Sequence, residues 1–248
     1  MIKMLLAVAL LTYPLFFQAA TADVIDDAIA NPNRPEADVA NDPGRKPAEV
    51  LKFFQIEPGM SVFDIFAGGG YYSELLSYVV GPGGSVVLYN NNPWNQFVMK
   101  SVDKRLLNNR LPNVTRNTAT PESLVDMDGQ YDAAIFILGM HDVYYSNPED
   151  GWVAIDKAKF LAGIYGLIKA GGILGVIDHK GSPVDHVNVA KNLHRIDEGI
   201  VIRDLEAVGF TLEATSDILT NENDDYSESV FLKQHQRKTD RSVLRFRK

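Results

Sequence analysis

The sequence predicts an α/β fold built on one doubly wound sheet, and three observations support this. Apolar runs of strand length alternate with segments of helical periodicity along most of the chain, which is typical of a parallel sheet with helices on both faces. Residues 131–138, YDAAIFIL, form a continuous apolar run of the kind found in strands buried on both faces. A glycine-rich turn joins the first predicted strand to a helix. The length of 248 residues suits one such domain, which we expect over residues 48–248.

The glycine-rich turn lies in residues 60–77, MSVFDIFAGGGYYSELLS. A short strand around Val62 ends at Asp64, Ala67 to Gly70 form the turn, and a helix follows. Such a turn brings backbone N–H groups close to a nucleotide-like ligand, and each glycine removes a Cβ that would collide with that ligand. Asp64, at the carboxyl end of the strand, is placed to accept hydrogen bonds or to attract a cation.

The other elements follow in order between turns marked by glycine and proline. Pro47 suits the first turn of a helix over 48–54. Further strands are expected at 85–89, near Val114, and at 131–138, 173–177, from Phe210 and at 242–246, with further helices at 96–107, 157–167, 187–193 and 200–208. Residues 23–47 are polar and proline-punctuated, and we expect an extended N-terminal arm that carries a short helix.

Residues 1–22 have the composition of a targeting segment. Lys3 gives a positive start, residues 4–17 are almost wholly apolar, and residues 20–22, ATA, form an A-x-A cleavage site. The apolar stretch is short for a membrane span. We therefore expect a signal peptide cleaved after Ala22, a periplasmic or secreted mature protein, and no stable membrane anchor after cleavage.

Composition excludes several kinds of function. The chain has no cysteine, which removes disulfides, thiolate nucleophiles and zinc–thiolate sites. The formal net charge of −8 argues against general electrostatic binding to nucleic acid, so we expect no nucleic-acid partner. The acidic run 221–225, NENDD, lies before the last predicted strand. We expect it to be a polar loop, to form a lid, or to contact a cationic substrate.

With all elements in order, the chain resembles the class I S-adenosylmethionine-dependent methyltransferases. The resemblance spans residues 48–248 and rests on VFDIFAGGGYYSELL, GPGGSVV, YDAAIFIL, LIKAGGILGVID and AVGF. The motifs RPEAD, GRKPAEVL and KTDRSVLRFRK are similar to those of predicted bacterial, exported methyltransferases. The resemblance implies a Rossmann-like sheet of seven strands, the last one antiparallel, in a single domain. It also implies that S-adenosylmethionine lies across the carboxyl ends of the first strands.

The resemblance implies a set of cofactor contacts at the glycine turn and at the end of the second strand. The candidate cofactor-binding residues are Asp64, Ala67, Gly68, Gly69, Gly70 and Asn90. Two positions depart from the family pattern. Phe66 stands where the family usually has the first glycine of its loop, and Asn90 stands where the second strand normally ends in Asp or Glu. Asparagine can accept one hydrogen bond from a ribose hydroxyl, but it lacks the charge that strengthens such bonds.

Two predicted strand ends carry histidine and aspartate side by side. His141-Asp142 follows the fourth strand, and Asp178-His179 follows the fifth. Ligands of an open parallel sheet lie beyond the carboxyl ends of its strands, so these residues are candidates for catalysis. Since adjacent residues of an extended chain point opposite ways, we expect only one residue of each pair to face the pocket. His194 lies between two helices, in a region that usually caps the substrate pocket of this fold.

Three interpretations of these side chains remain open. A histidine is a general base, or histidine and aspartate bind a divalent metal ion that orients the substrate, or the side chains cap strand ends. We favour the first, with His141 as the base, Asp178 or His179 as a substrate contact, and no metal.

Three functions fit these residues. The first is transfer of a methyl group from S-adenosylmethionine to a small-molecule or envelope acceptor, which needs little beyond alignment and a base. The second is a ligand-binding or sensor protein that keeps the fold without the transfer chemistry, which Phe66 and Asn90 would explain. The third is a metal-assisted hydrolase or lyase that uses the His-Asp pairs. The sequence favours the methyltransferase.

Overall fold

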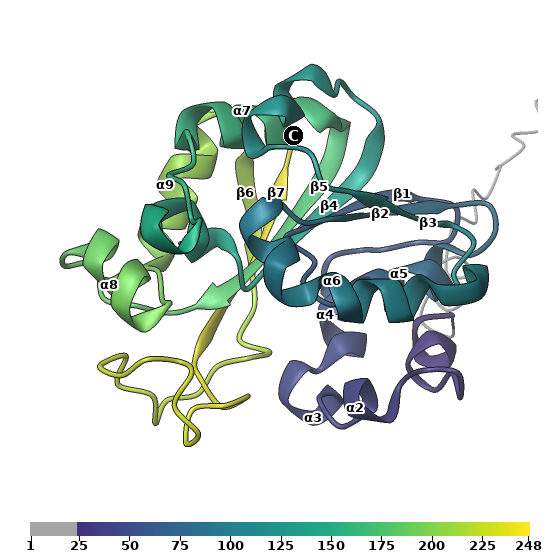
Figure 1. The fold of residues 1–248 in the computed structure, drawn as a ribbon, viewed down its shortest axis with the longest axis horizontal. Coiled ribbons are helices and arrows are strands. Elements are labelled where there is room, and N and C mark those ends of the chain that lie inside the picture. The colour runs from purple at the N-terminus through teal and green to yellow at the C-terminus, as the bar shows by residue number, and fades with distance from the viewer. Residues whose placement is uncertain (1–23) are drawn as a thin grey trace, which may run out of the picture.

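A seven-stranded mixed sheet forms the centre of the structure, a computed structural model that describes residues 24–248 (Figure 1). The signal peptide and cleavage site expected in residues 1–22 lie outside the described residues. Among the helices that are described, none is long and apolar enough to cross a membrane.

The sheet has the strand order β3-β2-β1-β4-β5-β7-β6. The strands are β1 (Ser61–Ile65), β2 (Ser85–Tyr89), β3 (Val114–Asn117), β4 (Tyr131–Ile137), β5 (Ile168–His179), β6 (Thr211–Thr215) and β7 (Arg241–Arg247). β1 to β5 pair in parallel, whereas β7 runs antiparallel to both β5 and β6. The predicted single-domain α/β sheet of seven strands with an antiparallel last strand is confirmed.

Helices cover both faces of the sheet (Figure 1). The helices labelled in Figure 1 are α2 (Glu36–Val39), α3 (Asp42–Arg45), α4 (Pro47–Phe53), α5 (Tyr71–Val80), α6 (Asn92–Leu106), α7 (Lys157–Leu167), α8 (His186–Leu193) and α9 (Glu198–Ala207). Alternate strand residues pack into two separate cores, because side chains alternate along a strand. Val62 of β1 packs in the core that contains α4 and α5, and its neighbour Phe63 packs in the core that contains α7 and α9. Burial on both faces explains the continuous apolar run of β4.

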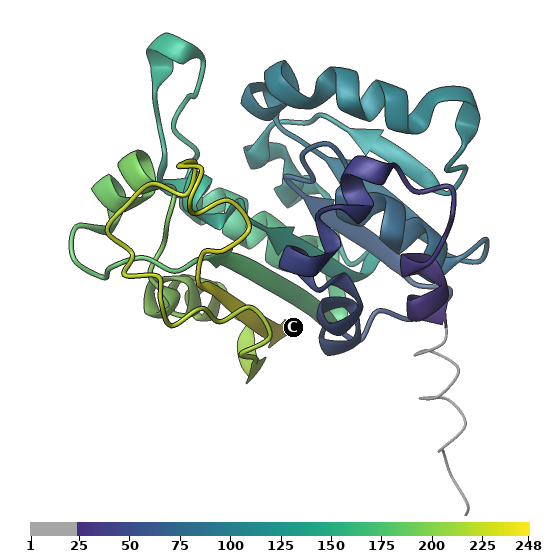
Figure 2. The same ribbon diagram turned by 90° about the horizontal axis from the view of Figure 1, so that it is seen from below.

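The N-terminal arm is folded rather than extended. Residues 24–29 are helical, and α2 and α3 follow. Arg34 holds the arm together, because its guanidinium donates two hydrogen bonds of 2.7 Å to the carboxylate of Asp42. The arm lies on the same side of the sheet as the 216–240 segment (Figures 1 and 2). Lys46, directly after α3, donates a hydrogen bond of 2.7 Å to the carbonyl oxygen of Ile218.

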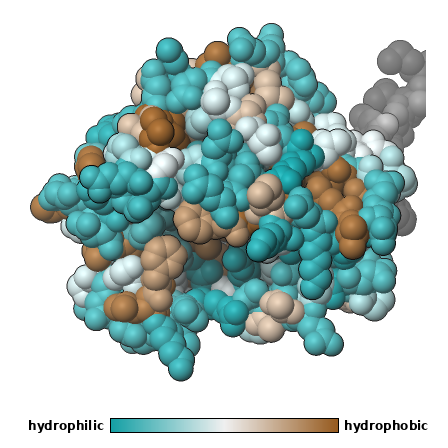
Figure 3. Space-filling view, in the orientation of Figure 1, coloured by the Kyte–Doolittle hydropathy of each residue, from teal (hydrophilic) through white to brown (hydrophobic). Residues whose placement is uncertain are grey.

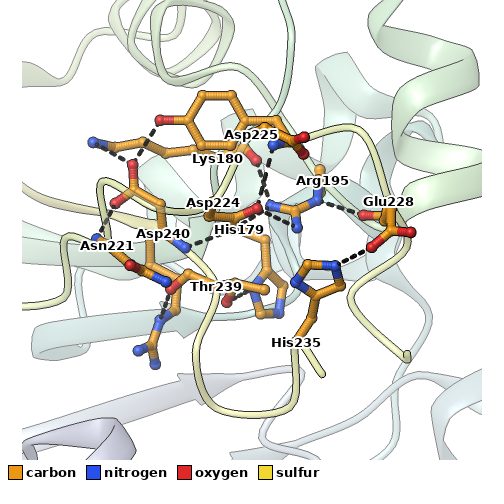
Figure 4. A network of polar contacts seen from close by, with 12 residues as sticks. His179, Lys180, Arg195, Asn221, Asp224, Asp225, Glu228, His235, Thr239 and Asp240 are labelled. Atoms are coloured by element: carbon orange, nitrogen blue, oxygen red, sulfur yellow. Dashed lines mark hydrogen bonds and ion pairs between the residues drawn. The ribbon is translucent and has the colours of Figure 1, made fainter. Parts of the chain in front are cut away.

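The 216–240 segment connects β6 to β7 without a helix or strand of its own. A bidentate ion pair fixes it: the guanidinium of Arg195 donates two hydrogen bonds of 2.9 Å to Asp224, and both side chains are buried (Figure 4). Asp224 also accepts a hydrogen bond of 2.7 Å from the backbone N–H of Asp240. Within the NENDD run, Asp224 therefore anchors the segment and is not free to contact a cationic substrate.

Candidate functional site

A cavity of about 770 Å³ opens at the carboxyl edge of the parallel strands, a volume typical of small-molecule sites. Figure 3 shows a hollow near the middle of this face of the molecule. The glycine turn after β1 lines one part of the cavity, and the 3₁₀ turn η3 (Met140–Tyr144) after β4 lines another. The N-terminal arm and the 216–240 segment complete the wall. The two sites predicted from the sequence therefore share one cavity.

Three of the predicted turn residues, Ala67, Gly68 and Gly69, line the cavity. Gly68 has a φ of +58°, which favours glycine. Gly70 lies behind the turn, where a Cβ would stand 2.8 Å from Leu88 Cδ1 and 2.9 Å from Arg105 Cδ. Glycine is thus required at position 70 for packing and for its φ of +83°, whereas residues 67–69 line the cavity.

The side chain of Asn90 forms hydrogen bonds to the glycine turn. Its Oδ1 accepts a hydrogen bond of 2.9 Å from the N–H of Gly68, and its Nδ2 donates one of 2.9 Å to the Gly68 carbonyl oxygen. The residue is buried. An ionised aspartate has no donor and could not form both bonds. The structure therefore places Asn90 as a support for Gly68, where the sequence suggested a ribose contact.

Phe66 occupies its glycine-like position at a steric cost, with a φ of +49° that is uncommon for bulky residues. Its ring stacks on Phe160 with a centroid distance of 5.4 Å and on Tyr89 at 5.7 Å. Gly139 leaves space for it, because a Cβ there would lie 3.2 Å from Phe66 Cβ. The aromatic core beneath the turn thus explains the departure from the family pattern.

Asp64 lines the cavity. It is 2% exposed and accepts a hydrogen bond of 2.6 Å from Ser73 Oγ. Burial raises its pKa to about 7, even though Ser73, Arg45 and Arg105 favour the ionised form. Arg45 of α3 also lines the cavity, and its guanidinium lies 4.6 Å from the centre of the Tyr71 ring. Sequence reasoning missed Arg45, because only the folded arm brings it to this edge.

His141 and Asp178 form a buried pair. Asp178 Oδ1 lies 2.8 Å from Nδ1 of His141, and its Oδ2 accepts a hydrogen bond of 2.9 Å from the His141 backbone N–H. Burial lowers the pKa of His141, but the carboxylates of Asp178 and Asp142 outweigh this and raise it to about 9. His141 lines the cavity and Asp178 lies behind it, so Asp178 orients the imidazole rather than contacting a substrate.

The other edge of the His141 imidazole faces two further candidates. Its Nε2 lies 3.4 Å from Asp142 Oδ1 and 3.4 Å from His194 Nδ1. His141 and Asp142 both line the cavity, so the expectation that only one of them faces it was wrong. The reason is local: they lie on η3 and not on an extended strand. Burial lowers the pKa of His194 to about 4.

His179 lines the cavity, unlike its neighbour Asp178. Its Nδ1 lies 2.7 Å from Thr239 Oγ1 in the polar network of the 216–240 segment (Figure 4). Burial lowers the pKa of His179 to about 3. This neutral imidazole is therefore tied to the segment that leads into β7.

Aromatic side chains form the outer wall of the cavity, and the sequence analysis did not identify them. They are Trp94, Phe97, Tyr145, Trp152 and Phe231. Phe97 stacks on Trp152 with a centroid distance of 6.1 Å, and Phe231 lies 4.5 Å from the His194 ring. Phe97 is 69% exposed and Phe231 is 68% exposed, so this aromatic wall offers an apolar surface at the entrance.

No protein-family model matches the chain. In sequence, the chain is 26% identical over 166 residues to the ubiquinone/menaquinone biosynthesis C-methyltransferase UbiE of Haemophilus ducreyi; the match covers 64% of this chain and 58% of that protein. The matched part is thus less than two thirds of the relative's length.

Two solved structures share the fold. A methyltransferase from Aquifex aeolicus, described as S-adenosylmethionine-dependent, has a TM-score of 0.55 at 21% identity, over 80% of this chain and 87% of that one. The arsenic(III) S-adenosylmethionine methyltransferase CrArsM from Chlamydomonas reinhardtii has a TM-score of 0.53 at 17% identity, over 90% of this chain and 72% of that one. With the strand order of the sheet, these matches show that the chain has the fold of the class I S-adenosylmethionine-dependent methyltransferases.

Proposed function

We propose that this protein is an S-adenosylmethionine-dependent methyltransferase that acts on a small-molecule or envelope acceptor. One observation carries the proposal: a single cavity joins the glycine turn to the His141 centre. A cofactor on the turn and an acceptor beside His141 would meet inside it. Shared enclosure of this kind supplies the alignment on which transfer reactions depend.

The side chains around Asp64 suit the methionine end of the cofactor, which carries an ammonium and a carboxylate. Asp64 would accept hydrogen bonds from the ammonium, and the guanidinium of Arg45 would pair with the carboxylate. Residues 67–69 would present their backbone along the cofactor. Because Asn90 is bonded to Gly68, the ribose would rely on cavity residues of α6, such as Ser101.

The cofactor supplies a methyl group on a sulfonium sulfur, and the leaving group is the neutral thioether S-adenosylhomocysteine. On the acceptor side, Nε2 of His141 would take the proton from the acceptor after His141 has itself lost its proton, which its pKa of about 9 places at alkaline pH. Asp178, 2.8 Å from Nδ1, would hold the ring in orientation and stabilise the imidazolium, as the acid of a catalytic triad does. The aromatic wall favours a flat apolar acceptor, in keeping with a relative named for quinone biosynthesis.

Calorimetric titration with S-adenosylmethionine and S-adenosylhomocysteine tests the cofactor proposal. We expect micromolar binding that Asp64→Asn weakens by about 10- to 150-fold, the range for a hydrogen bond to a charged group. Asp132→Asn is the matched control, because Asp132 pairs with Lys169 and does not line the cavity. Absence of heat at millimolar ligand would refute the proposal.

A second candidate, a binding protein without transfer chemistry, is favoured by the uncharged Asn90 at the end of β2. A turnover assay distinguishes the methyltransferase from the binding protein. A methyltransferase forms S-adenosylhomocysteine with some member of a panel of phenols and quinols. A protein that binds the cofactor tightly yet yields no product with any acceptor would support the binding role instead.

We also propose that the enzyme is exported, on the composition of residues 1–22. N-terminal sequencing of the protein isolated from its native cells tests this. A chain that starts at Asp23 is expected. A chain that starts at Met1 would refute export and place the enzyme beside the cytoplasmic supply of cofactor.

A further inference from the structure

Three potential metal ligands converge on the acceptor side of the cavity. They are Nε2 of His141, Oδ1 of Asp142 and Nδ1 of His194, and the candidate ligand atoms of these residues all lie within 4.8 Å of one another. His141 and Asp142 come from η3, and His194 follows α8. All three residues line the cavity, so the remaining side of an ion held by them would be open to a substrate.

The spacing of these atoms matches coordination better than direct hydrogen bonding. Nε2 of His141 lies 3.4 Å from Asp142 Oδ1 and 3.4 Å from His194 Nδ1, which is longer than ordinary N–H hydrogen bonds. Two ligand atoms that each lie about 2.1 Å from one tetrahedral ion are about 3.4 Å apart. These two separations therefore match coordination of one ion, and the third, between Asp142 and His194, is at most 4.8 Å.

Residues behind two of the three ligands already fix their orientation. Asp178 pairs with Nδ1 of His141 at 2.8 Å, which leaves Nε2 as the coordinating atom, and a carboxylate behind a ligating histidine is the usual arrangement in metal sites. Trp94 Nε1 donates a hydrogen bond of 3.1 Å to Oδ2 of Asp142, which leaves Oδ1 facing the centre. Asp142 is 4% exposed, so water does not solvate its carboxylate.

We propose that His141, Asp142 and His194 bind a divalent first-row transition ion such as Zn²⁺, Co²⁺, Mn²⁺ or Fe²⁺. Two imidazoles and one carboxylate suit these ions better than Mg²⁺ or Ca²⁺, which prefer oxygen ligands. An open coordination position faces the cavity. There the ion would bind an acceptor oxygen and lower its pKa, so that it replaces His141 as the activating group. This role, unlike binding of the ion, rests on the proposed methyl transfer.

Titration with Co²⁺ tests the site, because its visible absorption reports coordination by nitrogen and oxygen ligands. The full chain is purified without a polyhistidine tag and treated with a chelator. We expect one equivalent of Co²⁺ to bind, to be displaced by Zn²⁺, and to be unaffected by excess Mg²⁺. His194→Asn should weaken binding by at least about 100-fold and Asp178→Asn by about 10- to 100-fold. Asparagine suits position 194, whose φ is +54°.

His235→Ala is the matched control, because His235 pairs with Glu228 and does not line the cavity; it should bind Co²⁺ as the wild type does. Circular dichroism shows that each variant is folded. Wild-type protein that binds no Co²⁺, or a folded His194→Asn variant with unchanged affinity, overturns the inference. Cofactor binding without Co²⁺ binding overturns only the metal site, whereas Co²⁺ binding without cofactor binding overturns only the proposed methyltransferase.

Discussion

Replacing the buried carboxylate of Asp64 should stabilise the ligand-free protein while it weakens cofactor binding. Burial raises the pKa of Asp64 from 3.8 to about 7. Between these values the unfolded chain has lost a proton that the folded protein still holds. The free energy of unfolding therefore falls as the pH rises through this window and levels off above it. In Asp64→Asn this loss is absent, and the amide oxygen can still accept the hydrogen bond from Ser73 Oγ.

The magnitude follows from the difference between the two pKa values. A difference of about three units, at about 1.4 kcal/mol per unit, amounts to about 4 kcal/mol above pH 7. At pH 5 only the first part of that loss has developed. The stability advantage of Asp64→Asn should therefore grow by roughly 2–3 kcal/mol between pH 5 and pH 8.

Urea unfolding of wild type and variant at several pH values measures this advantage. Asp132→Asn is the control: burial opposes ionisation of Asp132, but Lys169 and the backbone of Ser61 outweigh it and lower its pKa. Its effect on stability should therefore stay constant from pH 5 to pH 8. If Asp64→Asn and wild type show the same pH dependence, Asp64 is ionised in the folded protein and the reasoning is refuted.

Other substitutions test the supports of the site. Asn90→Asp should destabilise the protein by about 1–3 kcal/mol without improving cofactor affinity, because its second oxygen would face the Gly68 carbonyl; urea unfolding and calorimetry would show a gain in affinity if this is wrong. Asp224→Asn leaves the charge of Arg195 buried and should cost about 3–5 kcal/mol in urea unfolding; a loss below 1 kcal/mol would contradict this. Gly175→Ala in β5 places a Cβ 2.6 Å from the ring of Phe54 and should lower stability by about 1–3 kcal/mol. This loss would be measured as a lower Tm.

Local sequence patterns predicted most of the sheet because the buried positions of the strands are occupied by apolar residues, which can be recognised in the sequence. β2 was expected at 85–89 and lies at Ser85–Tyr89, between a glycine turn and a polar run. That polar run also marks where prediction failed. The next helix was expected from residue 96, but the side chain of Asn91 accepts a hydrogen bond from the Trp94 N–H and caps α6, which starts four residues earlier at Asn92. Strand ends and helix caps use the same residues.

Apart from His194, the site residues that were predicted correctly follow a strand. Asp64 and His141 lie at predicted strand ends, and both line the cavity. Arg45 and Phe231 reach the cavity from the N-terminal arm and the 216–240 segment, whose positions depend on long-range contacts such as Lys46 to Ile218. Such contacts leave no periodic pattern in the local sequence. Cavity residues that depend on them can therefore be identified only from the folded structure.

The polar side chains of the site differ in how completely the protein itself satisfies them, and this difference indicates where ligands act. Asp178 accepts hydrogen bonds from the backbone N–H groups of His141 and His179 and pairs with the His141 ring. Asp64 and Asp142 are as deeply buried, yet burial raises the pKa of each carboxyl. A fold that keeps such groups costs stability unless a cation meets them. The cofactor ammonium at Asp64 and a metal ion at Asp142 would each supply that charge.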